Sequence, residues 1–467
     1  MKTYRNAASK TGRFVFYLAL MAGGAIFGAM SGVFVETAEA ADEKHILNDS
    51  TGGDCSQIGI WSAQELTCTV TTDTLYEIYI DSDGITLDGN GHTLTGAGVH
   101  ENNDAITVTG RTGVTVKNFI LQHFNYGIHL ISSHNSTVTN NISTANEAAG
   151  ISLSHATGNT ITGNTISNVN SDTGICIGYA SSNNHLSANT ITDADRGIYL
   201  HDLSNSNTIT ENTMSRNLNA LTLYDSDSYN TITGNILTGN ATAVHLHRSS
   251  NYNILSGNTI SDNDSGLYMS DGASFNQVYQ NNFINNSNQA LVSGGSGNEF
   301  HLPFPAGGNY WSDYDTPDES CNDLDSDGNC DSPRFFNGGQ DDLPAINQNA
   351  WVCTTPVLSL DLPGAAYWDN FADFQNQQLS IDWRITNNGG VVVRGLDLIA
   401  NYHSGGVVTT SQLPISIGNL AANGGSKTVT VKSHVPVGLG SFRSTVFIEA
   451  EDSCGTSYYF PGRPPEV

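Results

Sequence analysis

A repeat of about 23 residues is the feature that most limits what this chain can fold into. Asparagines recur through the middle of the chain, and in the later units a second asparagine precedes each of them by five residues. Repeats of fixed length indicate a solenoid in which each unit packs only on its neighbours. The first column is Asn90, Asn118, Asn140, Asn164, Asn189, Asn212, Asn235, Asn258 and Asn281, and the second is Asn135, Asn159, Asn184, Asn207, Asn230, Asn253 and Asn276.

Each unit contains three short segments in which apolar and polar residues alternate. One set is "GIYL" at 197–200, "NTIT" at 207–210 and "NTMS" at 212–215, with turn-forming residues between the segments. Alternation with period two predicts β-strands, and the i, i+3, i+4 pattern of helical repeats is missing. We therefore predict an all-β chain whose main part is a parallel β-helix of about nine coils.

The same model explains why the repeat is so polar. Only the inward residue of each strand is buried in a coil of this size, so a few apolar side chains suffice for one unit. Asparagines at the bends should tolerate unusual backbone angles and bond to the same group about 4.8 Å away in the next coil. The expected inward residues of one unit are Ile198, Leu200, Ile209 and Met214.

The N-terminus has the pattern of an export signal. Four basic residues precede an apolar run at 14–35, and "AEA" at 38–40 fits a small-residue cleavage site. An uncleaved anchor is the alternative, although four glycines in the run weaken it as a spanning helix. We predict a signal peptide at 1–40 and a secreted, periplasmic or cell-surface protein with no membrane span after cleavage.

The charge of the chain restricts its partners. The net charge of −28 becomes −30 once the +2 of residues 1–40 is removed. So acidic a surface repels phosphate backbones and anionic lipid, which argues against nucleic acid or membranes as partners. It also disfavours an anionic polysaccharide unless cations or a local basic patch intervene.

We divide the rest of the chain into three sections. Residues 41–300 form the β-helix, whose opening part, from His45 to about Asp88, caps the first coil. Residues 301–350 form a loop-rich C-terminal cap. Residues 351–467 contain short alternating strands separated by Asn-Gly-Gly and Pro-Gly turns, which predict a β-sandwich of about seven strands.

Seven cysteines in an exported chain suggest disulfides. Their spacing groups six of them into pairs and leaves Cys176 over. The pairs are Cys55 with Cys68, Cys321 with Cys330, and Cys353 with Cys454.

Two motifs make the chain resemble a known family. "GITLDGNGHTLTG" at 84–96 and the terminal "GGNYWSDYD" at 307–315 with "DDLPAI" at 341–346 are similar to the NosD-like right-handed parallel β-helix proteins. The last section, with "RITNNGG" at 384–390, resembles the cell-adhesion-related, Ig-like β-sandwich of envelope proteins. The resemblance implies a right-handed β-helix, an exported protein that handles or binds carbohydrate, and an envelope partner for the sandwich. The copper role behind the family name does not follow from the fold.

The acidic stretch "DLDSDGNCD" at 323–331 has the spacing of a calcium loop. Position 12 is Arg334 and not glutamate, so a bidentate ligand has to come from Asp313, Asp315 or Asp341. The alternative is a solvated acidic turn held by Cys321 and Cys330. We predict structural Ca²⁺ bound by Asp323, Asp325, Asp327, Asn329 and Asp331.

The outer face of the "GIYL" sheet is the second candidate site. Aligning the units at the small residue stacks outward positions one coil apart. One column reads His129, Ser152, Cys176, Tyr199, Thr222, His245, Tyr268; the next reads Ile131, Ser154, Gly178, His201, Tyr224, His247, Ser270; the strand ends carry Asp202, Asp225, Arg248 and Asp271.

This face suits several kinds of chemistry. Rings and polar groups in a row suit sugar binding. Asp202 and Asp225, about 5 Å apart on adjacent coils, fit a retaining glycosidase, and a His or Tyr base with Arg248 fits a uronate lyase or C5-epimerase. Pectin-hydrolase signatures and an Asp-Pro-His segment are absent from the sequence. The candidate catalytic residues are His201, Asp202, Tyr224, Asp225, His247 and Arg248, and the candidate substrate-binding residues are Tyr199, His245, Tyr268 and Asp271.

Three other interpretations stay open. The outward Tyr, Thr and His residues also simply favour sheet surfaces, which leaves a structural or adhesive role. Paired His245 and His247, with His201 two coils away, are compatible with a transition metal. Thr-x-Thr pairs on the "NTIT" segments resemble ice-binding arrays, although His185, Ser187 and Ser256 interrupt them.

Overall fold

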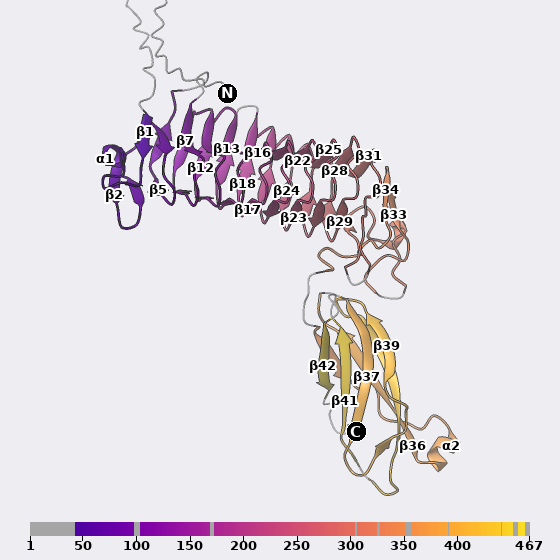
Figure 1. The fold of residues 1–467 in the computed structure, drawn as a ribbon. Coiled ribbons are helices and arrows are strands. Elements are labelled where there is room, and N and C mark those ends of the chain that lie inside the picture. Colours follow the sequence, from indigo (N-terminus) through magenta and orange to yellow (C-terminus); the bar gives the residue numbers. More distant parts are fainter. Residues whose placement is uncertain are drawn as a thin grey trace, which may run out of the picture. The chain divides into compact units, whose positions relative to one another are not determined.

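The computed structural model describes residues 43–97, 103–168, 172–303, 306–324, 327–351, 356–390, 392–439, 441–451 and 456–462. The predicted signal peptide, Asp325, Cys353 and Cys454 lie outside these residues. The described residues confirm the predicted all-β fold, in which a solenoid of parallel strands is followed by antiparallel sheets (Figure 1).

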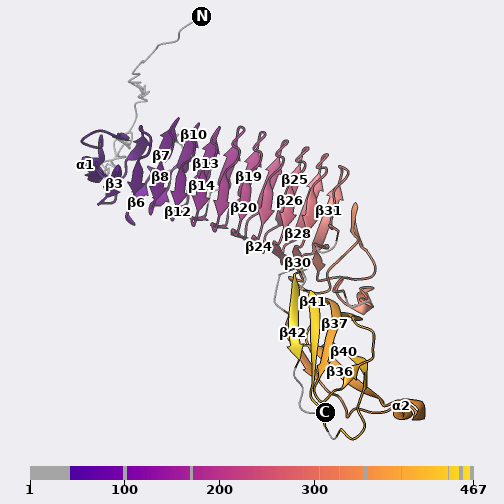
Figure 2. The same ribbon diagram turned by 60° about the horizontal axis from the view of Figure 1, so that its bottom comes forward.

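Three parallel sheets wrap the solenoid, and consecutive coils stack their strands side by side (Figure 2). The described residues contribute eleven strands to the first sheet, of which the first two have four residues and the others have six. They are β1 (Glu43–Ile46), β4 (Glu77–Ile80), β7 (Asp104–Thr109), β10 (Tyr126–Ile131), β13 (Ala149–Ser154), β16 (Thr173–Gly178), β19 (Arg196–His201), β22 (Asn219–Tyr224), β25 (Thr242–His247), β28 (Ser265–Ser270) and β31 (Asn288–Ser293).

The other two sheets are built mostly from three-residue strands. The second sheet is β2 (Gly59–Ser62), β3 (Thr67–Val70), β5 (Thr86–Asp88), β8 (Thr115–Lys117), β11 (Thr137–Thr139), β14 (Thr160–Thr162), β17 (His185–Ser187), β20 (Thr208–Thr210), β23 (Thr231–Thr233), β26 (Ile254–Ser256) and β29 (Gln277–Tyr279). The third sheet is β6 (Thr93–Thr95), β9 (Ile120–Gln122), β12 (Ile142–Thr144), β15 (Thr165–Ser167), β18 (Thr190–Thr192), β21 (Thr213–Ser215), β24 (Ile236–Thr238), β27 (Thr259–Ser261), β30 (Asn282–Ile284) and β32 (Tyr310–Trp311).

The start of the solenoid differs from the expected cap. Strand β1 already pairs in parallel with β4, so a coil begins where only a cap is predicted. The helix α1 (Cys55–Ile58) and the antiparallel pair β2–β3 close this end, and the predicted Cys55–Cys68 disulfide joins them. The solenoid therefore has about ten coils, one more than the asparagine column indicates.

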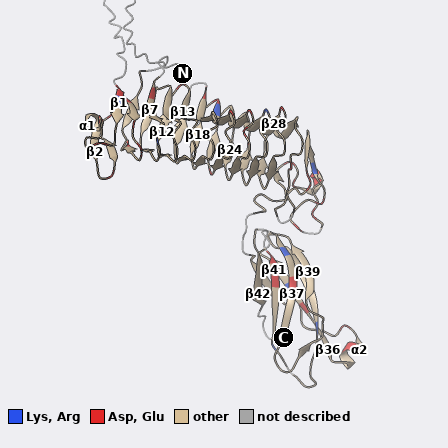
Figure 3. Cartoon of the chain, in the orientation of Figure 1, with Lys and Arg blue, Asp and Glu red and all other residues tan. Residues whose placement is uncertain are grey.

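One apolar stripe fills the inside of the coils, as predicted. Ile198, Leu200, Ile209 and Met214 are all fully buried, and the equivalent residues of other coils join them in one continuous core. Charged residues are sparse along the β-helix, most of whose ribbon is neither acidic nor basic (Figure 3). The strands of each coil can contain so many polar residues because the side chains next to the buried ones face water.

Asparagine ladders join the coils, which confirms the predicted stacking. The side-chain amide of Asn212 donates to Oδ1 of Asn235 at 3.0 Å, and the backbone N–H of Asn212 donates to the same oxygen at 2.9 Å. A third ladder, which the sequence analysis missed, follows the third sheet. Its members are Asn217, Asn240, Asn263 and Asn286.

Four members of the predicted ladders are misplaced. The residue that donates to Oδ1 of Asn164 is Asn141, not Asn140, and Ser136 takes the place assigned to Asn135. Phe119 takes the place assigned to Asn118, and Asn90, like Asn118, has a left-handed backbone angle. The left-handed backbone angle belongs to the residue just before each ladder position. Asn140 (φ +55°) and Glu211 (φ +58°) are examples. The side-chain amide of a ladder asparagine reaches the neighbouring coils only from the position after this bend residue.

The C-terminal cap closes the open end of the core. Trp311 stacks on Phe283 with ring centroids 4.3 Å apart, and the guanidinium of Arg334 covers the indole at 4.4 Å. The short pair β33 (Arg334–Phe336) and β34 (Gly339–Asp341), the 3₁₀ turn η1 (Pro317–Glu319) and the predicted Cys321–Cys330 disulfide hold the loops.

In the described residues of the last section, eight strands form two antiparallel sheets, where about seven strands are predicted. Apolar side chains of both sheets, including Trp383 and Leu398, share one core, as expected of a sandwich. The first sheet of the sandwich is β35 (Leu358–Asp361), β36 (Gln378–Asn387), β40 (Ser426–His434) and β38 (Val408–Thr409), and the second is β39 (Ile415–Leu420), β37 (Val393–His403), β41 (Ser444–Glu451) and β42 (Ser457–Gly462).

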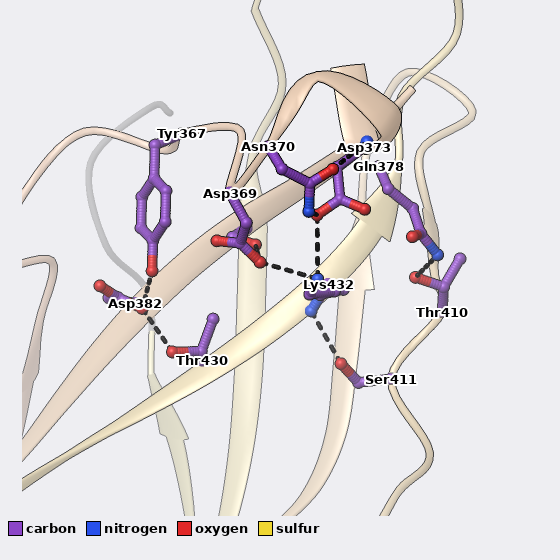
Figure 4. A network of polar contacts seen from close by, with 11 residues as sticks. Tyr367, Asp369, Asn370, Asp373, Gln378, Asp382, Thr410, Ser411, Thr430 and Lys432 are labelled. Atoms are coloured by element: carbon purple, nitrogen blue, oxygen red, sulfur yellow. Dashed lines mark hydrogen bonds and ion pairs between the residues drawn. The ribbon is translucent and has the colours of Figure 1, made fainter. Parts of the chain in front are cut away.

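A polar network fixes one extra segment on the sandwich (Figure 4). Lys432 pairs with Asp369 at 2.7 Å and with Asp373 at 3.1 Å, and Asp382 accepts from Tyr367 at 3.2 Å. Asp373 belongs to the short helix α2 (Phe371–Gln375). The network therefore anchors the segment that carries α2.

Candidate functional site

The first sheet of the solenoid places the predicted columns in register. Tyr199 pairs with Thr222, which pairs with His245, which pairs with Tyr268, and the neighbouring column aligns His201, Tyr224 and His247. Parallel strands in register bring side chains of equal position together on one face. We call the set Tyr199, His201, Tyr224, His245, His247 and Tyr268 the aromatic face.

The rings of the aromatic face form a continuous row. Centroid distances are 4.9 Å for Tyr199 and His201, 6.2 Å for Tyr199 and Tyr224, and 5.0 Å for Tyr224 and His247. His245 lies 5.1 Å from His247 and stacks on Tyr268 at 4.8 Å. Four successive coils thus contribute to one surface of touching rings.

Two arginines cover tyrosines of this row. The guanidinium of Arg248 lies 4.6 Å from the centroid of the Tyr224 ring, and that of Arg196 lies 4.4 Å from the Tyr199 ring. The sequence analysis identified Arg248 and missed Arg196. The sequence does indicate Arg196, since it is the outward residue at the start of β19, the strand that also contains Tyr199.

His201 joins an acid and a thiol. Its Nδ1 lies 3.0 Å from Oδ2 of Asp202, and its Nε2 lies 3.5 Å from Sγ of Cys176. Burial raises the pKa of Cys176 to about 12, and nearby Asp172 adds to the effect, so this cysteine is a neutral thiol at neutral pH. The partner of Cys176 is therefore His201.

The two histidines of β25 share one hydroxyl. Ser270 Oγ lies 2.7 Å from Nδ1 of His247 and 3.2 Å from Nε2 of His245, and Asp271 lies 3.4 Å from the same Nδ1 of His247. Burial, with repulsion from His247, lowers the pKa of His245 to about 4. His245 is therefore neutral at neutral pH and available for hydrogen bonding.

The paired carboxylates predicted for a glycosidase differ in their surroundings. Asp202 contacts His201 and is partly buried, whereas Asp225 is exposed. A third carboxyl, Asp227, was missed. It is fully buried and accepts N–H bonds from Ser204 at 2.7 Å and Tyr224 at 3.0 Å.

Burial raises the pKa of Asp227 to about 8, and the charges of Asp202 and Asp225 contribute. Asp227 stands where other coils have Ser181, Ser204 or Ser250, whose hydroxyls bond the backbone. An aspartate in a column of serines was therefore the feature of the sequence that could have indicated this buried carboxyl.

The floor of the aromatic face contains an unsatisfied hydroxyl. Thr222 is 5% exposed, and its Oγ1 has no hydrogen-bond partner among the described residues. It lies between Tyr199 and His245 in the same column. Buried polar groups usually have partners, so this hydroxyl is an exception on the first sheet.

The described carboxylates of the acidic loop accept hydrogen bonds from the backbone of the same loop. Asp323 accepts from the N–H groups of Asp327 and Gly328, Asp327 from Asn329, and Asp331 from Leu324. Among the described residues, which omit Asp325, no three His, Cys, Asp or Glu side chains are arranged to hold a metal ion.

The three acids expected to complete the loop are used elsewhere. Arg334 binds Asp313 through two nitrogens, at 3.1 and 2.7 Å. The Tyr310 hydroxyl donates to Asp315, and the buried Asp341 accepts from Asn309, Trp311 and Leu343. Each of the three candidates for the supplementary ligand thus has a partner outside the 323–331 loop.

Two family models match the chain. Residues 56–214 and 104–260 match the model described as right handed beta helix region, and residues 211–316 match the model described as periplasmic copper-binding protein (NosD). The resemblance inferred from the sequence is confirmed. No curated protein sequence matches the chain.

Solved β-helix structures are similar at low identity. The periplasmic alginate epimerase AlgG is 13% identical with a TM-score of 0.39, over 50% of this chain and 74% of that one. The AlgE6 A-module of an Azotobacter vinelandii mannuronan C-5 epimerase is 15% identical with a TM-score of 0.37, over 48% and 80%. The Dettilon tailspike protein is 13% identical with a TM-score of 0.38, over 84% and 85%. Likenesses this weak carry no argument about function.

Among the residues the structure describes from 43 onward, no helix is long and apolar enough to cross a membrane.

Proposed function

We propose that this NosD-like β-helix protein is exported and binds an extracellular polysaccharide on its aromatic face. The continuous row of rings over four coils carries the proposal. Tyr and His offer flat apolar faces together with polar tips, which suits sugar rings that are apolar on one side and carry hydroxyls at their edge. A row that repeats with the coils suits a polymer better than a single sugar.

Polar groups beside the rings support specific binding. The neutral imidazole of His245 is available for sugar hydroxyls. Asp202, Asp225 and Asp271 line the strand ends, and Arg248 is the one basic residue in this column of four. Because the acids outnumber the base, we propose a neutral polysaccharide as the ligand.

A glycan array followed by product analysis tests this function. We expect the wild type to be retained on neutral polysaccharides, with no new reducing ends and no unsaturated products. Tyr199→Ala/Tyr224→Ala should lose retention. The matched control is Tyr229→Ala/Tyr252→Ala, which removes two exposed tyrosines stacked at 5.2 Å on a corner of the same solenoid. Equal retention by all three proteins would refute the proposal.

Catalysis on a polysaccharide is the second candidate function. The contact between His201 and Asp202 favours it, because a carboxylate that holds an imidazole prepares it as a proton acceptor. The triple variant His201→Ala/Asp202→Ala/Asp225→Ala should then abolish lyase, epimerase or hydrolase turnover. Turnover that survives these changes would exclude this site.

We further propose that the C-terminal sandwich contacts an envelope partner through the α2 segment. Three aromatic side chains there are exposed, namely Trp368 at 39%, Phe371 at 71% and Phe374 at 55%. Clustered exposed apolar groups mark interaction sites, and the Lys432 network holds this cluster in place (Figure 4). Trp368→Ser/Phe371→Ser should release the protein from isolated envelopes, whereas the exposed Tyr459→Ser should not.

A further inference from the structure

A second hydrogen-bonded cluster lies on the first sheet, on the coils before the aromatic face. Nδ1 of His129 lies 3.0 Å from Oδ2 of Asp104, and Nε2 of His129 lies 3.3 Å from Oγ of Ser154. The three side chains come from β7, β10 and β13, which are consecutive strands of the sheet. Hydroxyl, imidazole and carboxylate are thus connected in series.

The register of the strands explains how the three residues meet. On the preceding coil His129 pairs with Thr107, and Asp104 lies three residues before Thr107 at the start of the same strand. On the following coil Ile131 pairs with Ser154, so Ser154 is a diagonal neighbour of His129 and within reach of a long side chain. The His129 ring contacts both residues.

Opposite nitrogens of His129 face the acid and the alcohol. The carboxylate of Asp104 favours the tautomer with hydrogen on Nδ1, which leaves Nε2 free to accept the Ser154 proton. His247 gives the contrast, because its Nδ1 faces both Ser270 and Asp271 and cannot relay a proton between them. His129 and Asp104 are only 15% and 17% exposed, which limits competition from water.

We propose that Ser154, His129 and Asp104 form an acyl-transfer site that removes ester-linked acyl groups from the polysaccharide bound by the aromatic face. Ser154 Oγ attacks the ester carbonyl while His129 Nε2 takes its proton. The ester C–O bond breaks, His129 returns the proton to the leaving sugar hydroxyl, and an acyl-serine forms. Water then attacks this intermediate by the same route, releasing a carboxylic acid and free Ser154.

Tyr126 is the group we assign to the developing oxyanion. Its ring packs on the His129 ring with centroids 4.5 Å apart, and its hydroxyl makes no hydrogen bond to any described residue. Burial raises the pKa of Tyr126, so the hydroxyl keeps its proton and is able to donate. A hydrogen bond from this hydroxyl to the ester oxygen would stabilise the tetrahedral intermediate.

The surroundings select the acyl group. Asp104 lies in the site and Asp202 lies near the adjoining Cys176, whereas the nearby Asp172 is paired with Arg196 at 3.6 Å. Negative charge from these groups disfavours an acidic acyl group, so the site fits a neutral acyl ester such as acetyl. That the ester is on a polysaccharide rests on the proposed function, whereas the acyl-transfer chemistry does not.

Hydrolysis of 4-nitrophenyl acetate by the full chain tests the chemistry alone. We expect Ser154→Ala and His129→Ala to lower the enzymatic rate by about 100-fold or more, Asp104→Asn to lower kcat with little change in KM, and Tyr126→Phe to lower kcat about tenfold. Ser167→Ala is the matched control, since it removes an outward hydroxyl of the same coil that bonds Thr144 at 3.3 Å. Melting curves identify a variant that fails to fold.

Covalent labelling makes the same test independent of turnover. A fluorophosphonate should label Ser154, as located by peptide mass, and Asp104→Asn should slow the labelling although the serine is intact. The acyl-transfer proposal would be overturned if the wild type is labelled no faster than Ser154→Ala, or if the label is found on another residue.

Release of acetate from an acetylated neutral polysaccharide tests the substrate separately. Tyr199→Ala/Tyr224→Ala should reduce release from the polymer, whereas the control Tyr229→Ala/Tyr252→Ala should release as much acetate as the wild type. If Tyr199→Ala/Tyr224→Ala also releases as much acetate as the wild type, the aromatic face does not deliver the substrate, and the proposed function fails while the acyl-transfer site stands. If neither substrate is hydrolysed although the array shows binding, the acyl-transfer site alone fails.

Discussion

The guanidinium of Arg248 lies over the ring of Tyr224, with its Cζ atom 4.6 Å from the ring centroid. The two residues come from adjacent coils, and Arg248 takes a left-handed backbone angle, φ +45°, at the end of its strand. This corner position turns the side chain back over the first sheet. Arg248 therefore both orients Tyr224 and places the basic group of the strand-end column at the aromatic face.

Replacing Arg248 should weaken polysaccharide binding. Loss of an exposed cation–π contact of about 0.5–1 kcal/mol predicts a two- to fivefold weaker affinity for Arg248→Ala, by isothermal titration. Arg216→Ala is the control, because Arg216 pairs with Asp193 at 2.7 Å away from the first sheet. An affinity unchanged in Arg248→Ala, or equally lowered in both variants, would contradict the assignment.

Breaking one ladder should destabilise the solenoid. Asn212 is fully buried, and its amide donates to Leu186 O, Thr210 O and Asn235 Oδ1. Asn212→Ala leaves several buried groups without partners, each at a cost of about 1–3 kcal/mol. Thr210→Ala, next to it on the surface, should cost well under half as much. If guanidinium unfolding shows comparable losses in the free energy of unfolding for the two variants, the ladder stabilises the solenoid no more than a surface residue does.

Asp227 should make stability depend on pH. Its pKa is raised to about 8 in the folded protein, against 3.8 when unfolded, so protonation favours the folded state. The contribution is fully present below pH 3.8 and is lost as the pH rises to about 8. Asp227→Ser, which restores the hydroxyl found in neighbouring coils, should therefore raise the melting temperature at pH 8 by several degrees more than at pH 5. If the difference in melting temperature between Asp227→Ser and the wild type is the same at both pH values, the raised pKa of Asp227 does not control stability.

We propose that the 323–331 loop binds calcium in a structural role, and chelation tests it. An ion that binds only the folded chain raises its stability, so EDTA should lower the melting temperature of the wild type. Asp323→Ala/Asp331→Ala should melt at the lower temperature with or without EDTA, whereas Asp318→Ala, an exposed acid in the nearby η1 turn, should respond as the wild type does. The loop has no calcium role if the wild type melts identically with and without chelator.

The fold followed closely from the sequence because the repeat fixes it. Period-two alternation assigned the inward residues, and Ile198, Leu200, Ile209 and Met214 are all buried. The register of the outer columns followed as well, since strands of equal length must align. The asparagine ladder was misplaced by one residue at Asn140 because a left-handed asparagine and a ladder asparagine look alike in sequence.

The site was only partly predictable. Sequence columns brought His201, Tyr224 and His247 together correctly, because they differ by whole coils. Contacts between positions that are not paired in register were missed, such as those of His129 with Asp104 and Ser154, since they depend on the side-chain rotamer. Asp227 was missed for another reason, namely that one exception in a column of serines is a weak signal against a polar background.

The most direct test of the account is the affinity of the aromatic face for polysaccharide. Affinity electrophoresis in gels that contain a neutral or a uronate-containing polysaccharide compares the wild type, Tyr199→Ala/Tyr224→Ala and Tyr229→Ala/Tyr252→Ala under identical conditions. We expect a neutral polysaccharide to retard the wild type and the Tyr229/Tyr252 variant but not the Tyr199/Tyr224 variant. Retardation of all three proteins to the same extent, or of none, would contradict this expectation.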